Sequence, residues 1–556
     1  MKSIQTIGDH LINRLAEIGI EHIFGVPGDY NLAFLDHIIN HPSVQWVGTA
    51  NELNAAYAAD GYARIKGAAA IVTTFGVGEL SAINGIAGSY AEYLPVLHIV
   101  GAPSTTSQTK YAKMHHTLAD GDFSHFTRMS AEVSAASCEL TVENAPDEID
   151  RVLRTMLTQH RPGYLVIPTN VACAPLPEKP QPFLFTPPAC DPKQLDAFSK
   201  QAAQHLMQAK TRVLLTDFLA ERWHCHSLIA QLLQTQALFS ATTMGGKSII
   251  TETQSGFLGI YAGTASLPTV QQAVESADAL ITIGTFFFDL ETSGFSHQLD
   301  ISRMIDIRPF SARIGDTFYP DLPMKEALRC LIKIIHQLKL PPITPSVTRP
   351  HLATPEENNE PLTQISLLAN IQNFIREDDL IIAEQGCSYF GAVNLKLPKN
   401  VKFIAQPLWA SIGYSLPATL GAQLADTTRR TILLIGDGAA QMTAQSLGTI
   451  LRHSLNPIIL LTNNHGYTVE RAIHGAQQTY NDIAQWNWPL LTQAMGPGKK
   501  IFSQQANTSH ELKQALLQAD QSKCLCIIDA HLSALDIPPL LATIAKAVEG
   551  KNTELH

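Results

Sequence analysis

The sequence of 556 residues has few cysteines and no long apolar run. No uninterrupted apolar stretch approaches the roughly 20 residues that a membrane-spanning helix needs. Eight cysteines scattered over a chain of this length are not the framework of a disulfide-rich protein. The first six residues, MKSIQT, lack the apolar core of a secretory signal. We therefore expect a soluble cytoplasmic protein with no membrane partner.

Basic side chains are fewer than acidic ones. There are 39 lysines and arginines against 49 aspartates and glutamates, which gives a formal net charge of −10. This balance argues against a general nucleic-acid binder. The chain carries no basic block, heptad repeat or low-complexity tract. Its length exceeds what one core supports and predicts about three to four domains.

Short apolar runs alternate with helical patterns through most of the chain. Prolines interrupt this alternation at residues 175–189 and 341–361, which we interpret as linkers. The linkers divide the chain into domains at residues 1–185, 190–340 and 360–556. Strands that alternate with helices predict an α/β fold, in which mostly parallel sheets are flanked by helices.

Residues 431–473 carry the clearest sign of a binding site. The apolar run 432–435 stops at Gly436-Asp437-Gly438, and the run 458–461 stops at Asn463-Asn464. Each run predicts a buried strand, and ligands of open parallel sheets bind where such strands end. Asp437 and Asn464 supply oxygen ligands suited to Mg²⁺, and Gly438 would let a diphosphate approach a helix start. The alternative is two ordinary strand-to-helix turns.

Four other places carry groups that could move protons, although each has a simple structural explanation. Asp29 follows a predicted strand and could lie in a surface turn. Glu52 begins a predicted helix and could favour its dipole. The pair His115-His116 could lie in an exposed loop, and Glu470 could be a helix surface charge.

Together these places resemble one family. The chain resembles the thiamine-diphosphate-dependent 2-oxo acid decarboxylases, which include pyruvate, indolepyruvate, phenylpyruvate and branched-chain 2-oxo acid decarboxylases. The resemblance spans nearly the whole length and implies a thiamine-diphosphate-binding fold at both ends. The first domain would bind the pyrimidine, the last the diphosphate, and a related α/β domain would lie between. It rests on residues 25–31, Glu52, residues 74–81, His115-His116, residues 407–409, residues 411–413 and the diphosphate motif.

The resemblance implies roles for individual residues. Mg²⁺ would be held by Asp437, Asn464 and the Gly466 carbonyl. Glu52 would hydrogen-bond the cofactor pyrimidine, and Ile412 would support its bent shape. Proton transfers would fall to Asp29, Glu52, His115, His116 and Glu470. Cofactor contacts would come from Glu52, Thr74, Cys387, Ser411, Ile412, Asp437, Gly438, Ala439, Asn464, Gly466 and Tyr467.

The resemblance also implies shared active sites, with Glu52 and the metal site contributed by different subunits. A homodimer would then be the smallest working unit, and the family suggests a homotetramer. Carboxylates close together and out of water should have raised pKa values, which suits acid catalysis near neutrality.

Three positions depart from the simplest pattern of the family, and two of them differ from pyruvate-type members in particular. Ala439 and Cys387 stand where serine and threonine hydroxyls are common, and each lost hydrogen bond costs on the order of 1 kcal/mol. Ala410 replaces a glycine, which we expect to be tolerated only if its φ is negative.

The predicted substrates are aromatic or longer aliphatic 2-oxo acids, because the region around Glu470 resembles indolepyruvate decarboxylases most. The pocket wall would be formed by Gln385, Tyr389, Val469, Ile473, Ile544 and Val548. Pyruvate is the alternative substrate, with acetaldehyde as product. Two further alternatives are a thiamine-diphosphate carboligase and a non-enzymatic paralogue. The histidine pair argues against the first, and the joint presence of all the candidate acids and histidines argues against the second.

Overall fold

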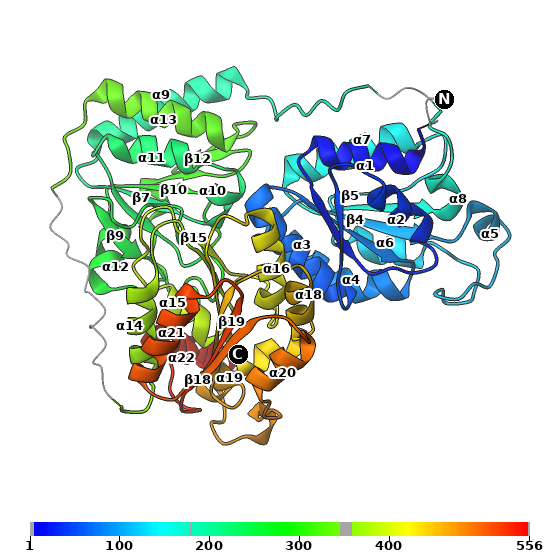
Figure 1. Ribbon diagram of the computed structural model, residues 1–556. Helices are drawn as coiled ribbons and strands as arrows, with labels where there is room; N and C mark the ends of the chain where they lie inside the picture. The colour runs from blue at the N-terminus through cyan, green and yellow to red at the C-terminus, as the bar shows by residue number, and fades with distance from the viewer. Residues whose placement is uncertain (1–4, 178–180, 345–358, 554–556) are drawn as a thin grey trace.

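The protein has three lobes, each built around one sheet (Figure 1). The computed structural model describes residues 5–177, 181–344 and 359–553, with side chains up to residue 550. Two six-stranded sheets belong to the first and last thirds of the chain, and a seven-stranded sheet belongs to the middle third.

The first sheet is parallel throughout, with strand order β2-β1-β3-β4-β6-β5. Its strands are β1 (His22–Gly25), β2 (Gln45–Gly48), β3 (Ala69–Thr74), β4 (Val96–Ala102), β5 (Ala136–Glu139) and β6 (Gly163–Pro168). The helices of this lobe are α1 (Ile7–Glu17), α2 (Leu32–Ile39), α3 (Glu52–Lys66), α4 (Val77–Ala91), α5 (Thr105–Thr109), α6 (His125–Ala131), α7 (Ala145–Gln159) and α8 (Thr169–Ala172).

The last sheet repeats the topology of the first. Its order, β15-β14-β16-β17-β19-β18, is again parallel throughout. The strands are β14 (Leu380–Ala383), β15 (Lys402–Ile404), β16 (Thr431–Gly436), β17 (Ile458–Asn463), β18 (Ile501–Ala506) and β19 (Leu525–His531). The helices are α14 (Gln364–Phe374), α15 (Cys387–Ala392), α16 (Ser415–Ala425), α17 (Asp437–Thr443), α18 (Ser446–Arg452), α19 (Thr468–Ile473), η2 (Thr479–Asn481), α20 (Trp488–Met495), α21 (Ser509–Gln521) and α22 (Pro539–Thr553).

The middle sheet has the order β13-β12-β11-β10-β7-β8-β9 and is parallel except at β12 and β13. Its strands are β7 (Arg212–Thr216), β8 (Phe239–Thr242), β9 (Phe257–Ile260), β10 (Ala279–Ile283), β11 (Met304–Ile307), β12 (Ala312–Ile314) and β13 (Thr317–Tyr319). The helices are α9 (Pro192–Gln208), α10 (Phe218–Arg222), α11 (His226–Gln234), α12 (Pro268–Glu275), η1 (Ile301–Arg303) and α13 (Met324–Leu338). The predicted fold class is confirmed.

The strands form where the sequence has short apolar runs bounded by turn residues. Strands β3 and β6 are buried at every position, as expected for parallel strands covered on both faces. Helix α3 begins with a side-chain cap, because the Asn51 side chain accepts from the Asn54 N–H, and Gly67 caps its C-terminal end in the left-handed region. The described residues of the two predicted linkers, 175–177, 181–189, 341–344 and 359–361, belong to no helix or strand, although Pro175 and Pro361 form isolated bridges with Thr6 and Thr508. Residues 178–180 and 345–358 lie outside the described residues.

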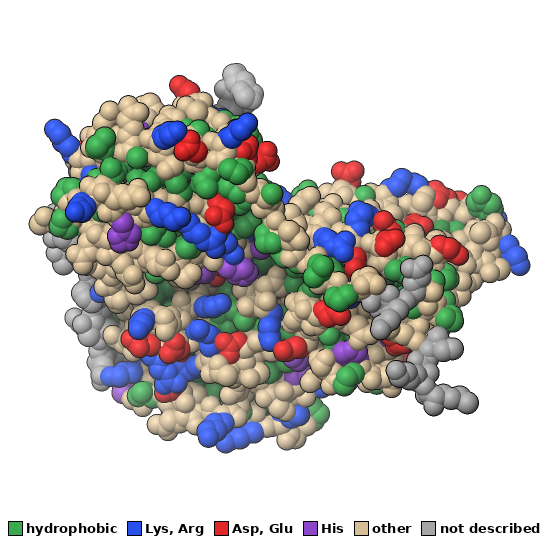
Figure 2. All heavy atoms as spheres, turned by 90° about the horizontal axis from the view of Figure 1, so that it is seen from above, with side chains coloured by type: hydrophobic (Ala, Val, Ile, Leu, Met, Phe, Trp, Pro, Cys, Tyr) green, Lys and Arg blue, Asp and Glu red, His purple; other side chains and the backbone are tan. Residues whose placement is uncertain are grey.

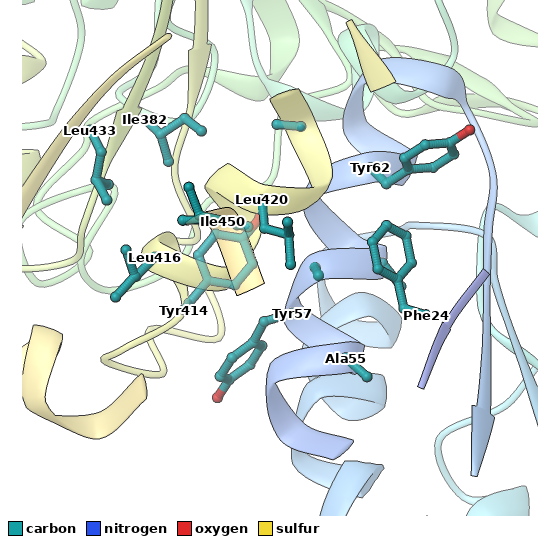
Figure 3. Packing of buried hydrophobic residues seen from close by; sticks show 14 of the residues in the cluster. Phe24, Ala55, Tyr57, Tyr62, Ile382, Tyr414, Leu416, Leu420, Leu433 and Ile450 are labelled. Atoms are coloured by element: carbon teal, nitrogen blue, oxygen red, sulfur yellow. The ribbon is translucent and has the colours of Figure 1, made fainter. Parts of the chain in front are cut away.

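Helices α3 and α16 join the first and last lobes (Figure 3). Tyr57 and Tyr62 on α3 and Leu420 on α16 belong to one core cluster. The backbones approach so closely that a Cβ at Gly421 would lie 1.7 Å from the Ala58 carbonyl oxygen. This contact excludes larger residues and fixes the position of Glu52, the first residue of α3, relative to the loop before α16.

A buried polar network lies beside the same contact. Asp60 accepts hydrogen bonds from Arg64 Nε at 2.7 Å, from the Tyr414 hydroxyl at 2.6 Å and from the Ser89 hydroxyl at 2.9 Å. Arg64 also bonds Glu92, which is itself buried. Because each charged group has a partner, burial of the network is compatible with stability.

The loop before α16 corrects one expectation from the sequence. Ala410 has φ +54°, in the left-handed region, whereas a negative φ was expected. The conformation costs an alanine about 1–2 kcal/mol. The Ala410 N–H donates to the Gln406 carbonyl at 3.0 Å, and the α3–α16 contact holds the loop that follows. Surrounding packing therefore offsets a local strain that a glycine would not have.

Surface and composition features agree with the charge balance. Figure 2 shows Lys and Arg side chains interspersed with Asp and Glu over the face seen from above.

Within the described ranges, no helix is both long and apolar enough to cross a membrane. All eight cysteines are free thiols, and four of them are buried.

Candidate active site

Two groups of predicted site residues lie at the ends of strands. The first group, which we call the N-terminal cluster, consists of Asp29, Glu52, Thr74, His115 and His116. The loop between α5 and α6 brings the histidines to Asp29, which follows β1. His115 Nε2 lies 2.8 Å from Asp29 Oδ2, and His116 Nδ1 lies 4.0 Å from Asp29 Oδ1.

Tyr30 orients the first histidine of the cluster. Its ring stacks on His115 with centroids 4.9 Å apart, and its hydroxyl lies 3.1 Å from His115 Nδ1. The Nδ1 atom of His116 is buried and has no hydrogen-bond partner. The cluster therefore holds one imidazole by two contacts and leaves one ring nitrogen of the other free for a ligand.

Glu52 and Thr74 lie next to each other in the same cluster. A Cβ at Gly78 would lie 3.1 Å from both Glu52 Oε1 and Thr74 Cγ2. Glu52 is half-buried, and burial raises the pKa of its carboxyl above the ordinary value, while a backbone hydrogen bond lowers it. The Thr74 hydroxyl is buried without a partner. A bound molecule could supply the missing hydrogen bond.

The second group surrounds the ends of β16 and β17, which are neighbours in the sheet. Asp437 begins α17, and its carboxylate accepts from the Gly438 N–H at 2.9 Å and from the Gly466 N–H at 3.2 Å. Burial raises the pKa of Asp437 to about 6, although both N–H donors lower it. A cation beside this carboxylate would replace the proton that burial favours.

Asn464 completes an oxygen-rich corner. One terminal atom of its amide lies 3.2 Å from Asp437 Oδ1 and 3.0 Å from the Gly466 carbonyl oxygen, and the other lies 3.0 Å from the Thr468 hydroxyl. If the first atom is the amide nitrogen, it donates to both oxygens. If it is the oxygen, three oxygens converge with no hydrogen between them, and a cation is needed.

A cavity of about 260 Å³ opens from this corner, and we call it the C-terminal cavity. Most of the residues predicted for the cofactor, metal and substrate lie in its wall, and so does Glu470, one of the predicted proton carriers. They are Gln385, Cys387, Ile412, Asp437, Gly438, Ala439, Asn464, Gly466, Tyr467, Val469, Glu470, Ile473, Ile544 and Val548. None of the N-terminal cluster residues lines this cavity, so one chain presents the candidate site as two separate halves.

Comparisons with known proteins assign the chain to a family. Residues 5–125, 199–338 and 384–530 match, in turn, the N-terminal TPP binding domain, the central domain and the C-terminal TPP binding domain of thiamine pyrophosphate enzymes. A protein named alpha-keto-acid decarboxylase from Mycobacterium ulcerans (strain Agy99) is 45% identical over 541 residues, which cover 97% of this chain and 95% of the relative. Proteins of the same name from Mycobacterium tuberculosis (strain ATCC 25618 / H37Rv) and Mycobacterium leprae (strain TN) are 45% and 43% identical. They match 97% and 99% of this chain, and 97% of each relative is covered.

The chain belongs to the thiamine-diphosphate-dependent 2-oxo acid decarboxylases.

The decarboxylase thus has its two cofactor-binding domains in the lobes that share one sheet topology. The N-terminal cluster lies within the first matched domain, and Asp437, Asn464 and Glu470 lie in the last. The resemblance seen in the sequence is confirmed, and so is the enzyme class. A carboligase and a non-enzymatic paralogue are disfavoured, because the relatives carry the name of a decarboxylase.

Two predicted site residues lie elsewhere. Tyr389 does not line the C-terminal cavity; it is 1% exposed and packs against Phe390 and Phe403. Cys387 and Phe390 are one turn apart on α15 and share the face toward the cavity, so Tyr389 points away. The Ser411 hydroxyl also lies outside the cavity wall.

Ser411 instead joins the loop before α16 to the first lobe. Its hydroxyl lies 2.6 Å from the Tyr57 hydroxyl and 3.3 Å from Asn84 Nδ2. The contact of Ser411 with the cofactor stays a prediction, and in the single chain its side chain faces Tyr57 and Asn84. Ala410 and Ile412, on either side of it, do line the C-terminal cavity.

Asp29 and Glu470 are exposed in the single chain, and they belong to different halves of the site. Cys387, by contrast, is buried, and burial raises the pKa of its thiol to about 12. It therefore stays protonated and offers only a weak S–H donor where other members have a hydroxyl.

Sequence reasoning missed several residues beside the C-terminal cavity. Glu384 is buried, and its carboxylate accepts from Ser415 N–H at 3.0 Å and Oγ at 2.7 Å and from the Gln385 N–H at 3.1 Å. It thereby ties the end of β14 to the start of α16. An acid directly after the apolar run 380–383 was a visible signal. Leu290, Phe390, Leu541 and Ala545 also line the cavity without any local signal.

Gly76 offers a test of how the histidine loop is held. A Cβ there would lie 2.0 Å from the His116 carbonyl oxygen, and the φ of Gly76 is +63°. We expect Gly76→Ala to displace the histidine loop and to lower kcat about 10²-fold, because small misplacements of reacting groups are costly. Steady-state kinetics with a 2-oxo acid substrate measure the kcat of the variant against that of the wild type.

Gly19 is the matched control, since it has φ +88° and no atom within 4 Å of its ideal Cβ. Gly19→Ala should lose on the order of 1 kcal/mol of stability through its positive φ alone, and it should keep its turnover. Equal losses of turnover in the two variants would contradict a specific role for the contact with His116.

Proposed function

We propose that the decarboxylase converts aromatic or longer aliphatic 2-oxo acids to the corresponding aldehyde and CO₂, with thiamine diphosphate and Mg²⁺. The convergence of the Asp437 carboxylate, the Asn464 amide and the Gly466 carbonyl beside an apolar cavity carries this proposal, because turning the amide oxygen inward gives three oxygen ligands. Their separations of 3.0 and 3.2 Å fit neighbouring ligands around Mg²⁺, since octahedral Mg–O distances of about 2.1 Å place them about 3 Å apart.

The cofactor would be held through its diphosphate and its pyrimidine. Mg²⁺ would bind Asp437 Oδ1, the Asn464 amide oxygen and the Gly466 carbonyl, and would neutralise the diphosphate. The N–H groups at the start of α17, at Gly438 and Ala439, would contact diphosphate oxygens. Ile412 lines the cavity and would support the cofactor rings, while Tyr467 closes the side next to Gly438.

Bound thiamine diphosphate would accept the electron pair that remains when CO₂ leaves. Glu52 would share its proton with the cofactor pyrimidine, and its raised pKa keeps that proton available closer to neutral pH. His115 and Asp29 share a hydrogen bond through which a proton can move. Glu470, in the cavity wall, would deliver or remove a proton at the substrate carbon.

Two chains would be needed for one site, because the N-terminal cluster and the C-terminal cavity are separate in a single chain. The proposed assembly is a homodimer in which each chain lends its cluster to the cavity of the other. The family resemblance suggests that dimers pair into a tetramer. A symmetric dimer would contain two equivalent sites.

The wall of the C-terminal cavity supports the choice of substrate. Val469, Ile473, Leu541, Ile544 and Val548 present aliphatic groups. Burial of an apolar substrate chain against these side chains favours binding, whereas burial of a charged chain there is unfavourable. A small substrate such as pyruvate would leave much of this surface uncovered.

A panel of 2-oxo acids tests the substrate class. We expect kcat/KM for phenylpyruvate and 2-oxohexanoate to exceed that for pyruvate, because each buried methylene contributes roughly 1–3 kcal/mol of discrimination. Val469→Ile should narrow the cavity and lower kcat/KM for phenylpyruvate about tenfold while changing that for pyruvate little. An aldehyde-coupled assay measures both.

Pyruvate serves as the internal control for the Val469→Ile variant, because general damage to the site would lower both rates. A wild-type kcat/KM that is highest for pyruvate would contradict the proposed substrate class. Loss of all activity on adding a chelator, with recovery on adding Mg²⁺, would support the proposed metal.

A further inference from the structure

Three metal-ligating side chains converge at the N-terminal cluster, away from the corner proposed for Mg²⁺. One ligand atom each from Asp29, His115 and His116 lies within 4.8 Å of the others. Among the described residues, no other group of three or more His, Cys, Asp or Glu side chains lies close enough together to share an ion. We propose that Asp29, His115 and His116 form a binding site for Zn²⁺ or a similar transition-metal ion.

The donor set selects the kind of ion. Two imidazoles and one carboxylate suit Zn²⁺, whereas Mg²⁺ prefers oxygen ligands and water. Three protein ligands leave a fourth position for water or a substrate oxygen, as in catalytic zinc sites. The site therefore differs chemically from the corner at Asp437, where the candidate ligands are all oxygens.

The geometry requires only a small adjustment. Tetrahedral Zn²⁺ with ligand distances of about 2.0–2.1 Å places neighbouring ligand atoms about 3.3 Å apart. The observed separations bracket this value, at 2.8 Å from His115 Nε2 to Asp29 Oδ2 and 4.0 Å from His116 Nδ1 to Asp29 Oδ1. A rotation of the Asp29 carboxylate changes both separations at once.

The surroundings of the histidines favour metal binding. His115 has its other ring nitrogen, Nδ1, beside the Tyr30 hydroxyl, so a proton on Nδ1 leaves the Nε2 lone pair for an ion. The Nδ1 atom of His116 is buried and has no partner, which an ion would supply. The backbone of His116 rests against Gly76, which limits movement of the loop. About half of the Asp29 and His115 side-chain surfaces is exposed in the single chain.

Bound Zn²⁺ would occupy the atoms that now share a hydrogen bond, His115 Nε2 and Asp29 Oδ2. The pair could then no longer pass a proton, so the ion would inhibit turnover. This consequence rests on the proposed function, whereas the binding site itself does not. Excess Mg²⁺ should not relieve the inhibition, because Mg²⁺ competes poorly for imidazole.

The test measures Zn²⁺ bound per chain by equilibrium dialysis of the enzyme saturated with thiamine diphosphate and excess Mg²⁺. We expect one Zn²⁺ per wild-type chain with a Kd in the micromolar range. His116→Gln should weaken this binding at least tenfold, and His116→Cys should restore it because a thiolate also binds Zn²⁺. Rescue by cysteine separates ligation from misfolding.

Two controls separate this site from other places where Zn²⁺ could bind. His37, which pairs with Asp9 at 2.8 Å on the same lobe, has only two ligand groups, and His37→Gln should leave binding unchanged. Asp437→Asn removes the carboxylate of the oxygen-rich corner and should also leave it unchanged. Equal Zn²⁺ binding by wild type and His116→Gln, or loss of binding only in Asp437→Asn, would overturn the proposal. Zn²⁺ binding without inhibition of turnover would support the binding site but contradict proton transfer between His115 and Asp29.

Discussion

Glu52→Gln is expected to lower the turnover number of the decarboxylase about 10²- to 10⁴-fold, the usual range for the loss of a positioned acid–base group. Glutamine keeps the shape of the side chain at the start of α3 but cannot give a proton to the cofactor pyrimidine. The residues that pack α3 against α16 include Tyr57, Tyr62 and Leu420, and the substitution at the first residue of α3 leaves them in place, so the fold should persist. Steady-state assays give turnover, and calorimetric titration gives thiamine diphosphate affinity.

The pattern of losses identifies the role of Glu52. Cofactor affinity should fall by no more than about tenfold, because one neutral hydrogen bond contributes on the order of 1 kcal/mol. Glu143→Gln, an exposed residue of the same lobe, is the control and should behave as wild type. A Glu52→Gln variant with normal turnover would remove this carboxyl from the mechanism.

Glu470→Gln is the second large expected effect. Glu470 lies in the wall of the C-terminal cavity, on the short helix α19 that also carries Val469 and Ile473. We expect the variant to lose about 10²- to 10⁴-fold in kcat and to bind thiamine diphosphate as wild type does, since Glu470 is a proton carrier rather than a cofactor ligand.

The substrate concentration dependence adds a second criterion. A residue that acts only in proton transfer lowers kcat and kcat/KM together, whereas one that only binds substrate raises KM. Glu377→Gln, exposed on the same lobe, controls for a general effect of removing a charge. An increase in KM with unchanged kcat would reassign Glu470 to substrate binding.

The sequence predicted the parts of the fold that depend on local patterns. The runs 432–435 and 458–461 lie in β16 and β17 as expected, because continuous apolar runs between turn residues have few alternatives. The placement of Asp437 and Asn464 at neighbouring strand ends also follows from the order of a parallel sheet. The equivalence of the two end sheets follows from the family resemblance and is visible in their strand orders.

Features that depend on packing between distant segments could not be read from local patterns. The φ of Ala410 is set by the loop between Gln406 and α16, and the burial of Tyr389 is set by the face that α15 turns to the core. Leu290 comes from the middle third of the chain and reaches the cavity only through lobe packing. The separation of the two halves of the site is likewise a property of the folded chain.

That separation makes the central claim testable with two inactive chains. Co-expression of Glu52→Gln with Asp437→Asn should give hybrid dimers in which one site carries both substitutions and the other carries neither. Random pairing makes about half of the dimers hybrid, so activity should return to about a quarter of the wild-type value, or to about half in hybrids purified through two tags. If each site lay within one chain, every site would carry a substitution, and the hybrids would be as inactive as the parent variants.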